Sequence, residues 1–204
     1  MSRHHPLAVF LLLCLVGCSS PGAFLDTNDG PLFTPHALSA DDHAVVYLYR
    51  PQSDWADQEL EAPGLFLNKK LVGSLPSNSY LVLDLEVASY PLEMRRPLFG
   101  SFWTALADGM LDFNRIAGFN LDVGAGGTYY LRYDELNPPP LAEGTATLGD
   151  GPLQLVPASL AEKEISATHE FQPPLRVAAD GQRVEEPGFW GSGVPWGCKG
   201  GLRR

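Results

Sequence analysis

The chain has 204 residues, and its 24 acidic against 14 basic side chains give a net charge of -10. This excess of carboxylates argues against binding of nucleic acid and against adhesion to anionic lipid through a basic patch. Hydrophobic residues make up 45% of the chain and charged ones 19%, a composition typical of globular and not of disordered proteins. The length fits one folded domain with additional segments.

The N-terminal segment has the pattern of an export signal. A short head with Arg3 precedes an apolar run that ends in Leu15-Val16-Gly17-Cys18. The run has about ten residues, whereas a membrane span needs roughly twenty, so we expect this segment to be removed. A cysteine behind a small residue is the acceptor of the lipoprotein pathway. We therefore predict a signal peptide over residues 1–17, cleavage between Gly17 and Cys18, and lipidation of Cys18, which contacts the membrane through its acyl chains.

The regions after the cleavage site differ in composition. Residues 18–40 are rich in Ser, Gly, Pro, Asn and Asp and predict a flexible, lipid-anchored linker. We expect a folded domain over 41–168 and an irregular tail over 169–204, which includes Cys198 as an incidental thiol. In a bacterium with two membranes, Ser19 behind the lipidated cysteine favours the outer membrane, with the domain facing the periplasm.

Short segments of alternating or β-branched character predict a series of strands. They cover residues 44–50, 64–67, 71–75, 80–85, 90–95, 119–123, 128–133 and 153–156. Asn68-Lys69-Lys70 predicts a tight hairpin turn, and residues 158–165 predict a short helix near the C-terminus. The fold class is therefore mainly β, an antiparallel β-sandwich of seven or eight strands.

A segment over residues 97–118 interrupts the strands with helical periodicity. Its apolar side chains recur at helical spacing and form a possible apolar contact surface: Phe99, Phe102, Trp103, Leu106, Met110 and Phe113. This face would pack on the protein core, lie in the bilayer interface or cover a ligand. We favour the core, because the opposite polar face lacks the Lys and Arg expected at membranes.

Two groups of side chains invite a functional interpretation. The tyrosines fall in predicted strands, where they most often complete a core, although an outward face of them would suit a sugar or protein partner. The loop with Asp54, Asp57, Glu59 and Glu61 is typical of a solvated surface, and a cation or basic partner is the alternative.

Reactive constellations are not recognisable in the chain. His36, His43 and His169 have no second ligand at metal spacing, and neither a Gly-x-Ser-x-Gly elbow nor a Cys-x-x-Cys pair occurs. We therefore expect no metal, no cofactor and no catalysis. A Ser/His/Asp site assembled from distant residues remains the enzymatic alternative.

Several strand sequences resemble a bacterial family found in many exported lipoproteins, which is defined by a domain of unknown function, DUF 2846. The resemblance rests on AVVYLYRP (44–51), GLFLNKKLVGSLPSNSYLVLDLE (64–86), YPLEMR (90–95) and AGGTYYLRY (125–133). It covers residues 42–166 and implies a cell-envelope β-domain. It supplies no catalytic residue.

The sequence thus favours a non-catalytic cell-envelope lipoprotein that presents a β-sandwich for contacts with an envelope protein or peptidoglycan. One alternative is a carrier or sensor of an apolar small molecule, with the segment from Phe99 to Phe113 as a cover over the sheet. A hydrolase with a dispersed site is the third hypothesis.

Overall fold

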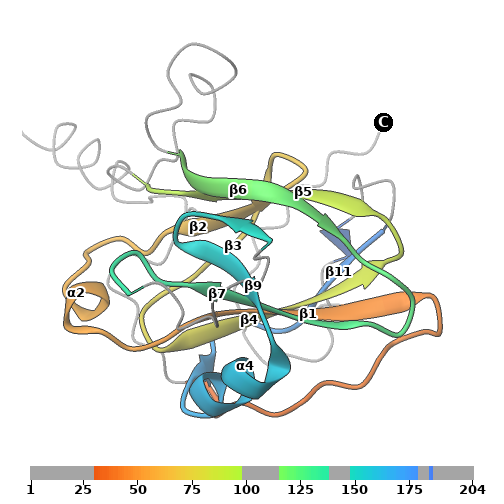
Figure 1. The fold of residues 1–204 in the computed structure, drawn as a ribbon, viewed down its shortest axis with the longest axis horizontal. Helices are drawn as coiled ribbons and strands as arrows, with labels where there is room; N and C mark the ends of the chain where they lie inside the picture. Colours follow the sequence, from red (N-terminus) through yellow and green to blue (C-terminus); the bar gives the residue numbers. More distant parts are fainter. Residues whose placement is uncertain (1–29, 98–114, 138–147, 179–183, 186–204) are drawn as a thin grey trace, which may run out of the picture.

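A computed structural model describes residues 30–97, 115–137, 148–178 and 184–185 of the chain. Two β-sheets lie face to face in it, with a short helix on the outer side of the larger sheet (Figure 1). The predicted mainly β sandwich is confirmed, and the predicted C-terminal helix is found at the expected residues as α4 (Ala158–Ile165).

The larger sheet has eight strands in the order β12-β11-β4-β1-β7-β9-β8, with β10 also paired to β4. Its strands are β1 (His43–Arg50), β4 (Ser79–Glu86), β7 (Thr128–Tyr133), β8 (Gly149–Asp150), β9 (Leu153–Val156), β10 (His169–Glu170), β11 (Leu175–Val177) and β12 (Val184–Glu185). The smaller sheet has the order β3-β2-β5-β6. It contains β2 (Gly64–Leu67), β3 (Lys70–Ser74), β5 (Ser89–Arg95) and β6 (Arg115–Asp122), and a helical turn, α2 (Asp54–Asp57), follows β1.

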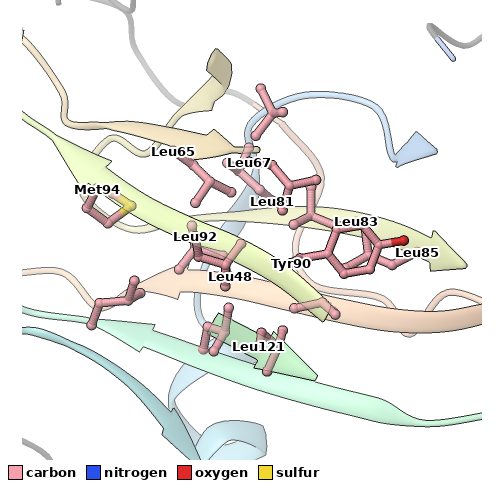
Figure 2. Close-up of a cluster of buried hydrophobic side chains, with 14 of the residues drawn as sticks. Leu48, Leu65, Leu67, Leu81, Leu83, Leu85, Tyr90, Leu92, Met94 and Leu121 are labelled. Carbon is pink, nitrogen blue, oxygen red and sulfur yellow. The ribbon is translucent and has the colours of Figure 1, made fainter. Parts of the chain in front are cut away.

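The main core lies between the two sheets. Successive strand side chains point to opposite faces, so Leu81, Leu83 and Leu85 of β4 all face the smaller sheet, as their alternation predicts. Figure 2 shows them with Leu48 of β1 against Leu92 of β5 and its neighbours. Each fully buried leucine stabilises the fold by about 1.5–3 kcal/mol relative to an exposed one. This interdigitated layer holds the two sheets together.

A second core covers the outer face of the larger sheet. Tyr47, Tyr49 and Tyr80 point away from the main core and pack under Ala161 and Ile165 of α4. All three tyrosines are buried. The interpretation of strand tyrosines as core residues is therefore correct for this face, and these rings are not an outward binding surface.

The β2–β3 hairpin closes through a two-residue turn. Asn68 and Lys69 both adopt positive φ, of 49° and 65°. Two consecutive left-handed residues are the signature of the type I′ turn, whose twist matches that of the flanking strands. The tight turn predicted here is confirmed, although lysine is an unfavourable residue for this conformation.

The strand pairing is mainly antiparallel, as expected, but it includes parallel pairs in the larger sheet. β7 pairs with β1 in parallel, and β10 and β11 pair with β4 in parallel. The intervening strands β2, β3, β5 and β6 belong to the other sheet. The chain therefore returns to the larger sheet by a long crossover, which permits a parallel neighbour.

The predicted helical segment over 97–118 is wrong at its C-terminal end. Residues 115–118 belong to β6, which pairs with β5 along its length. Ala117 and Leu121 enter the main core and Phe119 between them packs against it, so every second residue faces inward and sheet pairing overrides the helical period. The rest of the predicted helix, residues 98–114, lies outside the described residues.

The domain limits also differ from the expected ones. Residues 30–36, expected in the linker, pack on the larger sheet, where the Phe33 ring lies 5.2 Å from both the Tyr47 and the Tyr80 ring. Beyond residue 168, the expected irregular tail contributes β10, β11 and β12 to the same sheet. Short-range patterns miss both segments, because each is ordered by contacts with residues far away in the sequence.

Candidate functional site

The residues predicted as functional from the sequence lie outside the described ranges. These are Gly17 and Cys18 at the cleavage and lipidation site, and the possible apolar contact surface of Phe99, Phe102, Trp103, Leu106, Met110 and Phe113. The structure instead shows three clusters of charged side chains whose members the sequence patterns did not bring together.

The largest, here called the arginine cluster, consists of Arg50, Glu59, Arg96, Tyr133 and Glu135. It gathers where β1, β5 and β7 end, at the same end of the sandwich as the loop after α2. Arg50 Nη1 donates to Glu59 Oε2 over 2.6 Å, and Arg96 Nη1 donates to Glu59 Oε1 over 2.8 Å. Arg96 Nη2 also donates to Glu135, which accepts the Tyr133 hydroxyl as well. Two carboxylates thus bind two guanidinium groups.

The ion pairs of this cluster are largely buried. The side chains of Arg50 and Glu59 are 3% and 8% exposed, whereas that of Arg96 is 40% exposed. Burial lowers the pKa of Arg96, but hydrogen bonding to Glu59 and the charges of Glu135 and Glu59 outweigh it, so the net pKa is raised. Burial and the hydrogen bond to Glu135 raise the pKa of Tyr133.

The arrangement suits structural support better than acid–base chemistry. Arg50 also lies over the Tyr133 ring at 5.3 Å from its centroid, and each glutamate already accepts from two donors. Arg96 joins the loop after α2 to the loop after β7. The exposed side chains Leu60 and Leu136 directly follow its two carboxylate partners, Glu59 and Glu135, in the sequence. These ion pairs thereby connect the two loops.

A second cluster brings a serine, a histidine and an aspartate together at the other end of β1. His43 Nδ1 lies 3.1 Å from Ser39 Oγ and 2.6 Å from Asp84 Oδ1, and Arg176 Nε lies 3.3 Å from Asp84 Oδ2. In a catalytic triad, serine and aspartate contact opposite nitrogens of the ring, so that one nitrogen can take the serine proton. Here both contact Nδ1. The geometry secures the start of β1 to β4 and lacks the triad relay.

The third cluster attaches α4 to the larger sheet. Glu164 of α4 accepts from the Tyr49 hydroxyl over 2.6 Å and from Arg132 Nε over 2.9 Å. Arg132 also donates to Asp134 and to the backbone oxygen of Asn137. Burial raises the pKa of Tyr49, and its hydrogen bond to Glu164 adds to this effect. These contacts explain why the helix stays on the tyrosine face.

The described ranges contain neither a metal-binding cluster nor a membrane-spanning helix. Within them, no three His, Cys, Asp or Glu side chains come together in a way that could hold a metal ion. In the same part of the chain, no helix is long and apolar enough to cross a membrane.

Sequence signals for the arginine cluster were present but weak. Arg50 ends a predicted strand of mostly apolar residues, which indicates that its guanidinium must find a partner. The acidic loop was interpreted as solvated, and for Glu59 this was wrong, because the side chain is buried between two arginines. Sequence spacing does not show which of the loop's carboxylates turns inward.

Comparison with known proteins gives one match. Residues 40–146 match the family described as "Protein of unknown function (DUF2846)". The searches of curated proteins and of solved structures gave no match. The matched region includes the arginine cluster and the pair of His43 and Asp84. It does not include Ser39, α4 or the segments 30–36 and 168–177.

Proposed function

The chain belongs to the DUF2846 family of proteins of unknown function, and we propose that it is a non-catalytic, lipid-anchored protein of the cell envelope. Its β-sandwich is displayed for contacts with an envelope protein or with peptidoglycan. Leu15-Val16-Gly17-Cys18 behind an apolar run is the observation that carries the proposal. Ser19 supports attachment to the outer membrane, with the domain in the periplasm.

The charged clusters support display over catalysis. Glu59 and Glu135 are engaged by arginines, and His43 meets Ser39 and Asp84 through a single nitrogen. A reaction centre needs a base or nucleophile positioned toward a substrate. In these clusters the ionisable groups are directed toward each other and brace loops that carry exposed Leu60 and Leu136.

Metabolic labelling with palmitate tests the anchor. We expect the full chain to incorporate label and to fractionate with membranes, and Cys18→Ala to lose both properties. The matched control is Cys14→Ala, which removes a cysteine four residues earlier in the same apolar run and keeps Cys18. Incorporation of label into the Cys18→Ala chain would contradict the proposal.

Display for contacts is tested separately. The lipidated protein is cross-linked in intact cells, and its adducts are compared with those of a chain carrying Leu60→Asp and Leu136→Asp. Adducts with a defined envelope protein or with peptidoglycan that disappear in the double variant support display. A cross-linking pattern restricted to lipid in both chains would count against it.

A further inference from the structure

Residues 30–36, here called the strap, are the part of the described chain nearest to the predicted lipid anchor. They pair through backbone hydrogen bonds with the segment that follows α4. Phe33 N donates to Thr168 O over 3.1 Å, and Glu170 N donates to Pro31 O over 2.8 Å. Leu32 forms an antiparallel bridge with His169. The strap is therefore paired by backbone hydrogen bonds, as a short strand would be.

Side chains hold both ends of the strap. His169 Nδ1 lies 2.7 Å from Gly30 O, and His36 N donates to the Tyr47 hydroxyl over 2.7 Å. The Phe33 ring meets Tyr47 and Tyr80 edge-on, an arrangement worth about 0.5–1.5 kcal/mol per pair beyond its buried area. The contacts extend over the whole strap, so it belongs to the folded domain.

Gly30 is required at the point where the strap begins. A Cβ placed on it would lie 1.8 Å from the backbone oxygen of Glu170. That oxygen belongs to the backbone of β10, so it cannot yield as a flexible side chain would. A glycine here permits the close approach of the two backbones.

The strap lies on one particular side of the sandwich. Phe33 joins Tyr47, Tyr80 and the α4 residues in the second core, which is the face of the larger sheet opposite to the main core. Figure 1 shows α4 on one side of the larger sheet and β5 and β6 on the other. The chain therefore enters the domain on the α4 side.

We propose that the strap fixes the exit point of the lipid tether beside β10, so that the α4 side faces the membrane and the four-stranded sheet faces away from it. This inference rests on the proposed lipidation of Cys18. It makes the membrane surface the neighbour of α4.

Docking of the strap on the domain also limits the length of the tether, which is the chain between Cys18 and the first docked residue. Twelve residue steps separate Cys18 from Gly30, which span at most about 43 Å, whereas the 25 steps from Cys18 to His43 would span at most about 90 Å. A docked strap therefore keeps the domain close to the bilayer.

The orientation is tested on the full lipidated chain in phospholipid vesicles with dye-labelled headgroups, in a Cys198→Ser background. Single reporters are placed at exposed sites on the two sides, Lys163→Cys on α4 and Asn120→Cys on β6. One sheet-to-sheet and one helix-to-sheet spacing separate them, about 20 Å in total. We expect the α4 reporter to lie closer to the headgroups by a distance of this order. Equal distances would overturn the proposal.

A reversible lock tests docking by replacing the contact between His169 and Gly30 O with a covalent link. Leu32→Cys with His169→Cys places two cysteines at bridge-paired positions, whose Cα separation suits a disulfide. We expect the disulfide to form on mild oxidation and to leave both reporter distances unchanged. If locking draws the domain toward the membrane, the strap is undocked in the native protein and the proposal is wrong.

Gly30→Ala provides the opposite perturbation, and Gly22→Ala is its matched control, which adds the same methyl group before the strap. We expect Gly30→Ala to move both reporters outward and to reduce the difference between them, and Gly22→Ala to change neither. A Gly30→Ala chain identical to the control would refute docking.

Failure of the chain to bind vesicles would refute lipidation and orientation together, whereas disulfide formation in the unbound chain would still report a docked strap.

Discussion

Replacing Glu59 with glutamine tests whether the arginine cluster holds the end of the sandwich together. The substitution keeps the shape of the side chain and removes the charge that faces Arg50. Both side chains are buried, at 8% and 3% exposure. Removing one partner of a buried ion pair costs about 3–5 kcal/mol, because the remaining charge stays buried without compensation. Since glutamine retains one acceptor oxygen, we expect a loss of about 3 kcal/mol.

The loss is measured as the free energy of unfolding in urea and as the melting temperature. For a domain of this size 1 kcal/mol corresponds to about 2–4 °C, so we expect a decrease of about 10 °C. The matched control is Glu162→Gln on the exposed face of α4, which should change stability by less than about 0.5 kcal/mol. Equal effects of the two substitutions would refute the reasoning.

A double variant separates the ion pair from general loss of packing. Arg50→Met removes the second charge and retains an apolar chain of similar length beside Tyr133. Because paired removal leaves no uncompensated charge, Glu59→Gln with Arg50→Met should be more stable than Glu59→Gln alone. Additive losses from the two changes would show that the pair is not coupled.

Three further predictions concern the rest of the domain. Burial raises the pKa of Tyr80 to about 12, and burial also raises the pKa values of Tyr49 and Tyr133. The folded state thus holds these protons more tightly than the unfolded chain, so their stabilising contribution is complete below pH 10 and is lost at higher pH, for Tyr80 as pH rises through about 12. Tyrosinate absorbance that is complete near pH 10, with circular dichroism still native, would contradict this. Lys69→Gly should stabilise the hairpin by about 1 kcal/mol in urea, since glycine adopts the left-handed turn without strain, whereas Lys70→Gly in the strand should not. Asp150→Ala should promote self-association in analytical ultracentrifugation, because Asp150 Oδ2 accepts the Gly118 N–H at 2.9 Å on edge strand β6; an unchanged sedimentation coefficient at high concentration would argue against that role.

Local sequence patterns were sufficient for most of the strands. The alternation of Leu81, Leu83 and Leu85 defines the inward face of β4, and the helix over residues 158–165 follows from its apolar spacing. The tight turn at Asn68-Lys69 was predicted from its position between two apolar runs. These features depend on contacts within one element or between neighbours along the chain.

Features that depend on distant residues were not predictable in this way. The parallel pairing of β1 with β7 needs a crossover through the other sheet, and the docking of Phe33 needs residues from beyond α4. Glu59 is buried because it lies between Arg50, the last residue of β1, and Arg96, which follows β5. Patterns of polarity and secondary-structure propensity along the chain do not predict such contacts between distant residues.

Intact mass spectrometry of the native protein isolated from its own envelope tests the central claim most directly. The account predicts a mature chain that begins at Cys18 and carries the mass of a diacylglyceryl group on that residue, since two or three acyl chains are needed for stable attachment. A chain that still contains residues 1–17, or one with an unmodified Cys18, would contradict the account.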